Sequence, residues 1–418
     1  MKKNFLAGLL TGLCGALLLF TLVGAVLVYV GNETKDGNGN LNKATASEQD
    51  TSSDGTDEDS YSQIVQKLTY LHMLVDNYYL EGTDKISFAD GIYKGFISSL
   101  DDPYSTYYTK EEYAALLESS SGKYCGIGAT VSQNAKTGVI TIVKPFKNSP
   151  AYKAGILPGD IIYKVNNEEV TGEDLSEVVS RMKGVEGTKV NITVVREDET
   201  KPIEFTITRQ YIEVPTIEYQ MLEDKIGYIT VSEFDEITVE QFIAAIDDLE
   251  AKGMKGLVVD VRNNPGGLLD SVVKMLDRLL PPELIVYTED KNNNREEEKA
   301  VDKKQINVPV AVLINGNSAS ASEIFAGTLQ DYETATIVGT TSFGKGIVQK
   351  VIPLSDGTAV KLTISKYYTP KGRNIHGTGI TPDIEVELDE ALKNEVTIPI
   401  EKDNQLQKAI STVKEKMK

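Results

Sequence analysis

Residues 315–324 read Asn315-Gly316-Asn317-Ser318-Ala319-Ser320-Ala321-Ser322-Glu323-Ile324, and this stretch is the most informative feature of the chain. It follows a β-branched apolar run, Val308 to Ile314, and leads into a helix-patterned segment, an order typical of a buried strand, a tight turn and a helix in an α/β protein. Ser320 and Glu323 form a capping box at the start of that helix. A hydroxyl there stands beside backbone N–H groups and the positive end of the helix dipole, where an oxyanion is stabilised. The pattern leaves three candidates for a nucleophile, Ser318, Ser320 and Ser322.

Histidine is nearly absent, because the chain holds only His72 and His376. His72 lies on an apolar, helix-patterned stretch far upstream and His376 lies in a Gly/Thr-rich loop, so a Ser-His-Asp triad is disfavoured. Lys345 stands between Gly344 and Gly346 and is the alternative base. A lysine accepts a proton only when neutral, so a desolvated pocket must lower its pKa. The competing interpretation is a solvated surface lysine.

The region from Lys225 to about Glu387 alternates apolar strands with helical periodicity, which predicts an α/β domain. We expect strands at 226–231, 256–261 and 308–314, helices at 239–251, 268–280 and 320–331, and further β segments at 336–339, 347–354 and 358–368. The charged stretch 289–304 is expected to be a surface excursion. Residues Arg262 to Gly267 follow a buried strand, so the N–H groups of Gly266 and Gly267 are candidates to complete an oxyanion hole with that of Ala321.

The region from Gly122 to Arg209 predicts short strands instead, at 139–143, 161–165, 190–195 and 203–207. A capping box at Thr171 to Asp174 predicts the start of a helix that continues through Val178, Val179 and Met182. The phrases Tyr124-Cys125-Gly126-Ile127-Gly128-Ala129 and Ser149-Pro150-Ala151-Tyr152-Lys153-Ala154-Gly155-Ile156-Leu157-Pro158-Gly159-Asp160 closely resemble a PDZ domain. Unhindered N–H groups at Gly126, Ile127, Gly128 and Ala129 would gather a peptide's terminal carboxylate, and Val178, Val179 and Met182 would line a pocket for its last side chain.

The amino-terminal end carries an uncharged apolar run from Phe5 to Val30 behind Lys2 and Lys3. As a helix it measures about 39 Å, enough to cross a hydrocarbon core of about 30 Å with some tilt. A cleaved signal peptide is the alternative, although its apolar region usually has only about 7 to 15 residues. The lysines stay inside by the positive-inside tendency, so we expect a single-pass protein of the cell membrane with its body on the extracytoplasmic side.

Composition excludes several classes. The net charge of −19 argues against nucleic acid as a partner, because phosphates demand clustered Lys and Arg. The two cysteines, Cys14 in the apolar run and Cys125 in the body, predict no intrachain disulfide. No Cys/His ligand cluster and no phosphate-binding loop is found in the sequence, so we expect no metal and no cofactor.

Four phrases in order are similar to the carboxy-terminal processing peptidases, also called tail-specific proteases: 318–324, 329–331, 342–346, and 367–370 continuing to 383. The resemblance covers roughly Tyr61 to Leu388. It implies that Ser320 is the nucleophile, that Lys345 is the general base, and that Gln349 assists the lysine. We expect Lys345, Ile347 and Gln349 to share one face of a strand. Asp331 lies eleven residues after Ser320, about 16 Å along a helix, so we interpret it as structural or as a second-shell partner.

The expected architecture is an α/β peptidase core (ClpP/crotonase-like) with an inserted β-rich PDZ domain, an N-terminal helical segment and one transmembrane helix. Its expected parts are a membrane anchor (1–30), a flexible linker (31–60), a helical region (61–121) with helices at 62–80 and 87–100, a PDZ domain (122–209), the peptidase core (210–390) and a helical tail (391–418). The helical segments at both ends are candidate surfaces for a homodimer. We expect a serine endopeptidase that hydrolyses proteins or peptides selected through their C-termini. The alternatives are a catalytically silent PDZ scaffold and an acyl-CoA hydratase-like enzyme, which would need paired carboxylates in its pocket.

Overall fold

The computed structural model describes residues 60–84, 86–393, 395 and 398–418. The predicted membrane anchor and nearly all of the predicted linker lie outside these residues. Among the helices that are described, none is both long enough and apolar enough to cross a bilayer. The chain divides between residues 85 and 86 into two units. The described part of the first unit is helix α2 (Tyr61–Tyr78), which begins after Ser60, whose side chain accepts a hydrogen bond from the Gln63 N–H.

The second unit opens with helix α3 (Phe88–Ser98), strand β1 (Thr106–Tyr108) and helix α4 (Lys110–Ser121). Thr109 and Glu112 form a full capping box at the start of α4. The helix ends at Gly122 in the left-handed conformation (φ 66°), and a side chain at this position would come within 2.3 Å of Ile237. Glycine is therefore required for the chain to turn from α4 into the following β domain.

The β-rich domain is a six-stranded antiparallel sheet in the order β3-β4-β5-β7-β8, with β6 paired to β5. Its elements are β3 (Ala129–Gln133), β4 (Ile140–Pro145), α5 (Pro150–Ala154), β5 (Ile161–Val165), β6 (Glu168–Glu169), α6 (Leu175–Met182), β7 (Lys189–Val195) and β8 (Ile203–Thr208). Strands β2 (Lys123–Gly126) and β9 (Gln210–Glu213) pair separately where the chain enters and leaves. The predicted start of α6 at Thr171 is wrong, because Asp174 caps the helix through the amides of Ser176 and Glu177.

The α/β domain is built on a sheet in the order β10-β11-β12-β15-β16-β19, in which only the β10–β11 pair is antiparallel. Its strands are β10 (Ile217–Met221), β11 (Ile226–Val231), β12 (Gly256–Asp260), β15 (Val310–Ile314), β16 (Ala335–Gly339) and β19 (Ile384–Glu385). Side chains alternate between two cores along β15: Val310, Val312 and Ile314 enter one, while Ala311 and Leu313 enter the other. Burial on both faces explains the continuous apolar runs of the sequence.

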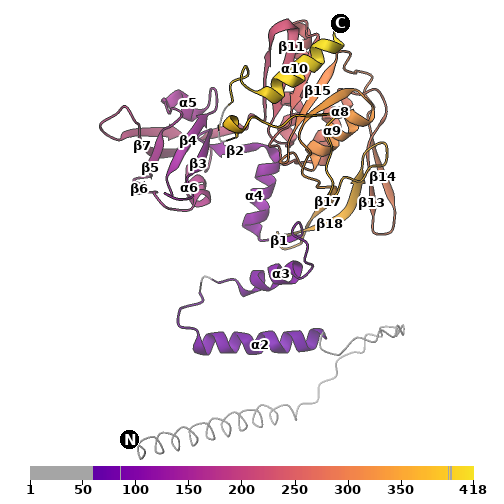
Figure 1. The fold of residues 1–418 in the computed structure, drawn as a ribbon. Coiled ribbons are helices and arrows are strands. Elements are labelled where there is room, and N and C mark those ends of the chain that lie inside the picture. The colour runs from indigo at the N-terminus through magenta and orange to yellow at the C-terminus, as the bar shows by residue number, and fades with distance from the viewer. Residues whose placement is uncertain (1–59, 85, 394, 396–397) are drawn as a thin grey trace, which may run out of the picture. The chain divides into compact units, whose positions relative to one another are not determined.

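Helices cover both faces of this sheet (Figure 1). Helices α7 (Glu236–Ala251), α8 (Leu269–Asp277) and α9 (Ala321–Asp331) supply Phe242, Leu276 and Phe325 to the larger core. Helix α10 (Asn404–Lys416) supplies Leu406, Ile410 and Val413 to the other. Short 3-10 turns lie at Glu223–Lys225 and Glu390–Leu392.

A second sheet in the order β1-β18-β13-β14, with β17 paired to β18, completes the domain. Its further strands are β13 (Leu284–Asp290), β14 (Arg295–Lys299), β17 (Ile347–Pro353) and β18 (Ala359–Tyr368). The expected surface excursion at 289–304 is therefore wrong in part, because it contains strand β14 and the end of β13. Every residue of β14 is exposed, so no apolar alternation marks the strand.

Candidate active site

Ser320 stands where β15 has ended and α9 begins. Its backbone angles are φ 54° and ψ −114°, a conformation rarely adopted by a residue with a side chain. Such strain persists only where the surroundings impose it, and it is concentrated at functional sites. Ser320 is half-buried and lines a cavity of about 620 Å³, which Ala321, Lys345 and Gln349 also line.

The hydroxyls of the two neighbouring serines, Ser318 and Ser322, form hydrogen bonds with other parts of the chain. The Ser318 hydroxyl donates to the Val261 carbonyl at 2.7 Å, and the Ser322 hydroxyl donates to the Asn264 carbonyl at 2.9 Å. Both side chains are fully buried and neither lines the cavity. The geometry therefore distinguishes Ser320 among the three serines that the sequence pattern left open.

Lys345 follows the loop after β16 and lines the same cavity. Burial lowers the pKa of its amine, nearby Lys361 adds to the shift, and Asp102 and Glu323 oppose it. The Lys345 Nζ lies 4.6 Å from the centre of the Tyr104 ring. Within the described chain no hydrogen bond joins this amine to the Ser320 hydroxyl, so the serine and the lysine line one cavity without contact between amine and hydroxyl.

Glu323 connects the two segments that carry these residues. Its Oε2 accepts hydrogen bonds from the backbone N–H groups of Ser320 and Lys345, each at 2.8 Å. Its Oε1 accepts from the Ser342 hydroxyl at 2.6 Å and from the Gly344 N–H at 2.7 Å. The side chain is fully buried, so its charge is balanced by these four donors instead of water. The capping-box spacing identified Glu323 as a helix cap, but not as the link to the lysine loop.

Tyr367 makes a second connection. Its hydroxyl lies 2.5 Å from the Lys345 carbonyl oxygen and 3.1 Å from that of Ser320. The ring is almost fully buried, and this burial, together with Glu323, raises the pKa of the phenol well above its ordinary value. The phenol therefore stays protonated, and these two carbonyls share its single O–H, with the Lys345 oxygen the nearer acceptor. From the sequence, Tyr367 was included only in a segment that resembles the family, and no role was predicted for this residue.

The loop after β12 lies against Ser320. A side chain on Gly266 would come within 2.8 Å of the Ser320 Cβ and of the Ala319 carbonyl oxygen. However, the Gly266 N–H already donates to the Asn264 Oδ1 at 2.8 Å. The structure thus corrects the predicted role of Gly266 as an oxyanion donor, because its N–H is occupied and its function here is close approach.

Gly267 and Ala321 are the two predicted oxyanion donors that line the cavity. Within the described residues, neither of their N–H groups has a backbone or side-chain acceptor. The oxyanion role of these two residues stays a prediction, and the structure shows that both line the cavity that holds Ser320.

Gln349 lines the cavity but does not contact the lysine. Its Nε2 donates to the Thr363 Oγ1 at 3.4 Å. The predicted common strand face is also interrupted, because β17 begins only at Ile347 and its register with β18 shifts between Val348 and Gln349. A bulge of this kind changes the direction of the following side chain.

Asp331 lies at the end of α9, away from the cavity. Its carboxylate accepts a hydrogen bond from the Lys371 N–H at 2.8 Å and pairs with Arg373. His376 does not line the cavity either, and its backbone packs where a side chain on Gly346 would lie. Asp331 therefore holds the loop after β18 against α9, and no carboxylate–histidine pair serves Ser320 within the described chain.

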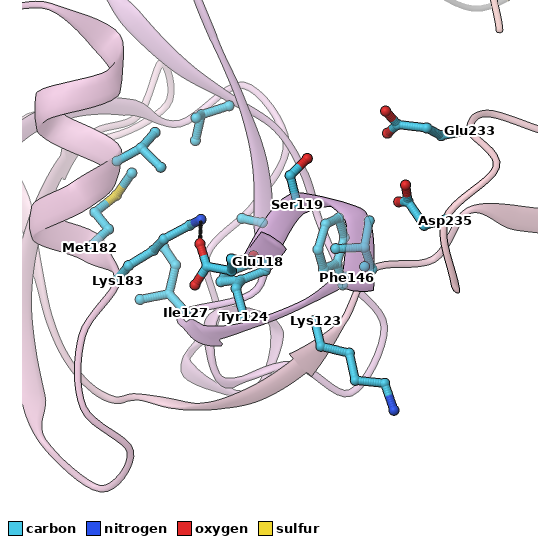
Figure 2. Close-up of a pocket in the computed structure, with 15 residues that line it drawn as sticks. Glu118, Ser119, Lys123, Tyr124, Ile127, Phe146, Met182, Lys183, Glu233 and Asp235 are labelled. Atoms are coloured by element: carbon cyan, nitrogen blue, oxygen red, sulfur yellow. Dashed lines mark hydrogen bonds and ion pairs between the residues drawn. The ribbon is translucent and has the colours of Figure 1, made fainter. Parts of the chain in front are cut away.

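The PDZ groove lies between β3 and α6 (Figure 2). Ile127, Ala129, Val131, Val179 and Met182 line it. Val178 does not, because it is fully buried in the core of the β domain, so its predicted place in the peptide pocket is wrong. Consecutive helical residues differ by about 100° in direction, which separates Val178 from Val179. Gly126 belongs to β2 and does not line the groove, whereas Gly128 adopts φ 76°, where a side chain would meet Ser149.

Tyr124 and Glu118 also line the groove. Burial raises the pKa of Tyr124 to about 12, and the nearby backbone amides of Ala129 and Gly128 oppose the shift. The phenol oxygen thus lies beside the amides predicted to hold a peptide carboxylate. Figure 2 shows Glu118 of α4 paired with Lys183 at the end of α6. Among the described residues, no group of three or more His, Cys, Asp or Glu side chains is placed to hold a metal ion.

Comparisons with known proteins extend these observations. Family models match at residues 225–386 (peptidase family S41), 141–196 (PDZ domain) and 21–112 (activating protease CtpB N-terminal domain). The chain is 40% identical over 328 residues to the carboxy-terminal processing protease CtpA of Bacillus subtilis (strain 168), an alignment that covers 78% of this chain and 70% of that protein. This chain belongs to the carboxy-terminal processing proteases of peptidase family S41.

Other comparisons agree with this membership. The chain is 42% identical over 300 residues to the carboxy-terminal-processing protease of Bartonella bacilliformis, covering 70% of this chain and 68% of that protein. A solved Bacteroides fragilis protein, described as a candidate S41 protease, shares the fold with a TM-score of 0.53 at 19% identity over 81% of this chain and 93% of that one. The predicted family, the serine-type peptidase activity and the PDZ domain are confirmed.

Proposed function

We propose that this S41 peptidase is a membrane-anchored, extracytoplasmic endopeptidase in which Ser320 and Lys345 form the catalytic dyad and the PDZ domain selects substrates by their C-termini. The observation that carries the proposal is that Ser320 and Lys345 line one cavity while Glu323 and Tyr367 hold both of their backbones. The lowered pKa of Lys345 supports its role as a base, since more of the amine is neutral near pH 7.

In the proposed reaction, the Ser320 hydroxyl attacks a peptide carbonyl while the Lys345 amine takes its proton. The N–H groups of Gly267 and Ala321 stabilise the oxyanion. The lysine then gives the proton to the leaving amine and later activates water, which releases the acyl group from Ser320. Proton transfer requires the amine to come within about 2.6–3.2 Å of the hydroxyl, a distance that often forms only with substrate bound. Rotation of the lysine side chain away from Tyr104 would supply this movement.

Selection by the PDZ domain is supported by the apolar groove between β3 and α6 and by the loop at Gly128. A peptide strand added to β3 would place its carboxylate at that loop. Membrane attachment is supported by the apolar run 5–30, and the extracytoplasmic location by the lysines that precede it. Apolar side chains exposed on α2, among them Ile64, Leu71 and Met73, support a homodimer.

The proposal is tested with the full chain in detergent or lipid discs. We expect an unfolded protein with a free apolar C-terminus to be cut by the wild type and not by Ser320→Ala. Because the Ser322 hydroxyl is buried, both the folding and the activity of Ser322→Ala are measured. An enoyl thioester should remain unchanged. Activity in Ser320→Ala would show that another residue is the nucleophile, and hydration of the thioester would favour the hydratase alternative. The location is tested by treating intact cells with an external protease, which should degrade the part of the chain that follows the predicted anchor.

A further inference from the structure

The PDZ groove and the catalytic cavity adjoin each other. Three residues line both of them: Ser119 at the end of α4, and Glu233 and Asp235 in the segment between β11 and α7. Figure 2 shows the two acidic side chains on the opposite side of the groove from Met182 and Lys183. An extended peptide that reaches from the PDZ groove to Ser320 therefore passes Glu233 and Asp235.

These two carboxylates lack a compensating charge. Asp235 is only 6% exposed, whereas Glu233 is open to solvent, and within the described chain neither forms an ion pair or accepts a hydrogen bond from a side chain. Burial raises the pKa of Asp235 to about 7, and the charge of Glu233 adds to this shift. Burial also raises the pKa of Glu233. The Asp235 side chain takes part in the capping box of α7 through the Thr238 N–H, but no cation balances its charge. Holding a carboxylate in such a place without an opposite charge costs free energy, which a cation arriving with the substrate would offset.

The neighbouring charged side chains do not neutralise Glu233 and Asp235. On the groove side, Glu118 pairs with Lys183 and Lys123 pairs with Glu213. On the catalytic side, Glu236 adds another acidic side chain to the lining. Lys345 and Lys361 also line this cavity, but among the described residues neither forms an ion pair with Glu233 or Asp235. Asp235 also stands at the N-cap of α7, which explains an acidic or polar residue there, but helix capping does not explain Glu233.

We propose that Glu233 and Asp235 form a subsite for a lysine or arginine side chain of the substrate, between the C-terminus held by the PDZ domain and the bond cut at Ser320. This inference rests on the proposed function. A cationic side chain gives charge-assisted hydrogen bonds to both carboxylates, and its long alkyl stem lets the charged group reach them from an extended backbone. The subsite makes the enzyme selective for an internal residue of the substrate in addition to its end.

The test uses the full chain and peptides with one apolar C-terminus, in which a single lysine is moved along the segment upstream of that end. Matched peptides carry glutamine or glutamate at the same position. We expect the wild type to cleave the lysine peptide about tenfold more efficiently in kcat/KM than the glutamine peptide at one position, and the glutamate peptide least well. Glu233→Gln combined with Asp235→Asn should bring the ratio of kcat/KM for the lysine peptide to that for the glutamine peptide close to one.

Asn at position 235 retains the ability to cap α7, so the double variant is expected to fold. Glu240→Gln is the matched control, because Glu240 is exposed on α7 and lines neither cavity. Cleavage of the glutamine peptide by the wild type and not by Ser320→Ala reports on the proposed function alone. Binding of both peptides to the Ser320→Ala chain gives a second readout that needs no hydrolysis. The subsite would be overturned if the wild type cleaved the lysine and glutamine peptides with equal kcat/KM. It would also be overturned if the double variant kept the wild-type preference for the lysine peptide.

Discussion

Gly266 lies so close to Ser320 that a β carbon at position 266 would come within 2.8 Å of the serine Cβ. The glycine also adopts φ 109°, which a residue with a side chain avoids. The loop after β12 and the turn that carries Ser320 therefore approach so closely that position 266 has no room for a side chain.

We expect Gly266→Ala to reduce kcat by at least about a hundredfold, because displacing the loop moves an oxyanion donor. Gly253→Ala is the matched control. Gly253 also has a positive φ of 80°, but nothing lies within 4 Å of the added methyl group. It should cost about 1 kcal/mol in the free energy of unfolding without loss of kcat. Peptide hydrolysis and thermal unfolding of both variants check this, and equal kcat values would contradict it.

Replacing Glu323 by glutamine should damage both activity and stability. Glutamine keeps one acceptor oxygen and turns an amide donor toward groups that themselves donate, so at least one backbone N–H among Ser320, Gly344 and Lys345 loses its acceptor. We expect a loss of about 2–4 kcal/mol in the free energy of unfolding and a large fall in kcat. Glu333→Gln, at the exposed turn after α9, is the control. Wild-type kcat in Glu323→Gln would show that the link is dispensable.

The pH dependence of hydrolysis should report on Lys345. Because the base must be neutral, kcat/KM should rise with pH, and its rising limb should lie below the ordinary lysine pKa of 10.5. Lys361 contributes to the lowered pKa, so Lys361→Gln should move this limb to higher pH. Lys345→Arg should be inactive, because guanidinium stays protonated. Turnover by Lys345→Arg would exclude Lys345 as the base, and a limb that Lys361→Gln leaves in place would exclude a contribution of Lys361 to its pKa.

Tyr124 should compete with the peptide carboxylate at the PDZ loop. Its oxygen lies beside the amides of Gly128 and Ala129, and phenylalanine cannot satisfy them. We expect Tyr124→Phe, in a Ser320→Ala background, to bind a peptide acid more tightly and a matched peptide amide with unchanged affinity. In the parent chain, amidation should weaken binding by about 1.5–3 kcal/mol for each lost charge-assisted bond. Titration by fluorescence anisotropy measures both, and equal affinities for acid and amide would rule out recognition of the chain end.

Local signals predicted much of this fold. Strands β5 and β11 begin and end where the apolar runs indicated, and Ser320 caps α9 as its spacing with Glu323 predicted. Other features depend on tertiary contacts that a sequence does not show. Strand β14 is held by pairing with β13, although its own residues are charged and exposed.

The errors at the candidate sites have similar physical causes. The Gly266 amide is occupied by Asn264, a contact two residues away that only the loop geometry creates. Val178 and Val179 are both apolar, and the direction of α6 decides which one faces a peptide. The register shift near Gln349 likewise follows from the pairing of β17 with β18.

The shared attachment of Ser320 and Lys345 limits how this enzyme can be switched. Their backbones are bound to the same carboxylate and the same phenol, so separating them would break several buried hydrogen bonds at once. Turning the lysine amine about its own side-chain bonds breaks none of these. A resting and a working enzyme could therefore share one main-chain structure and differ in the angles of a single side chain.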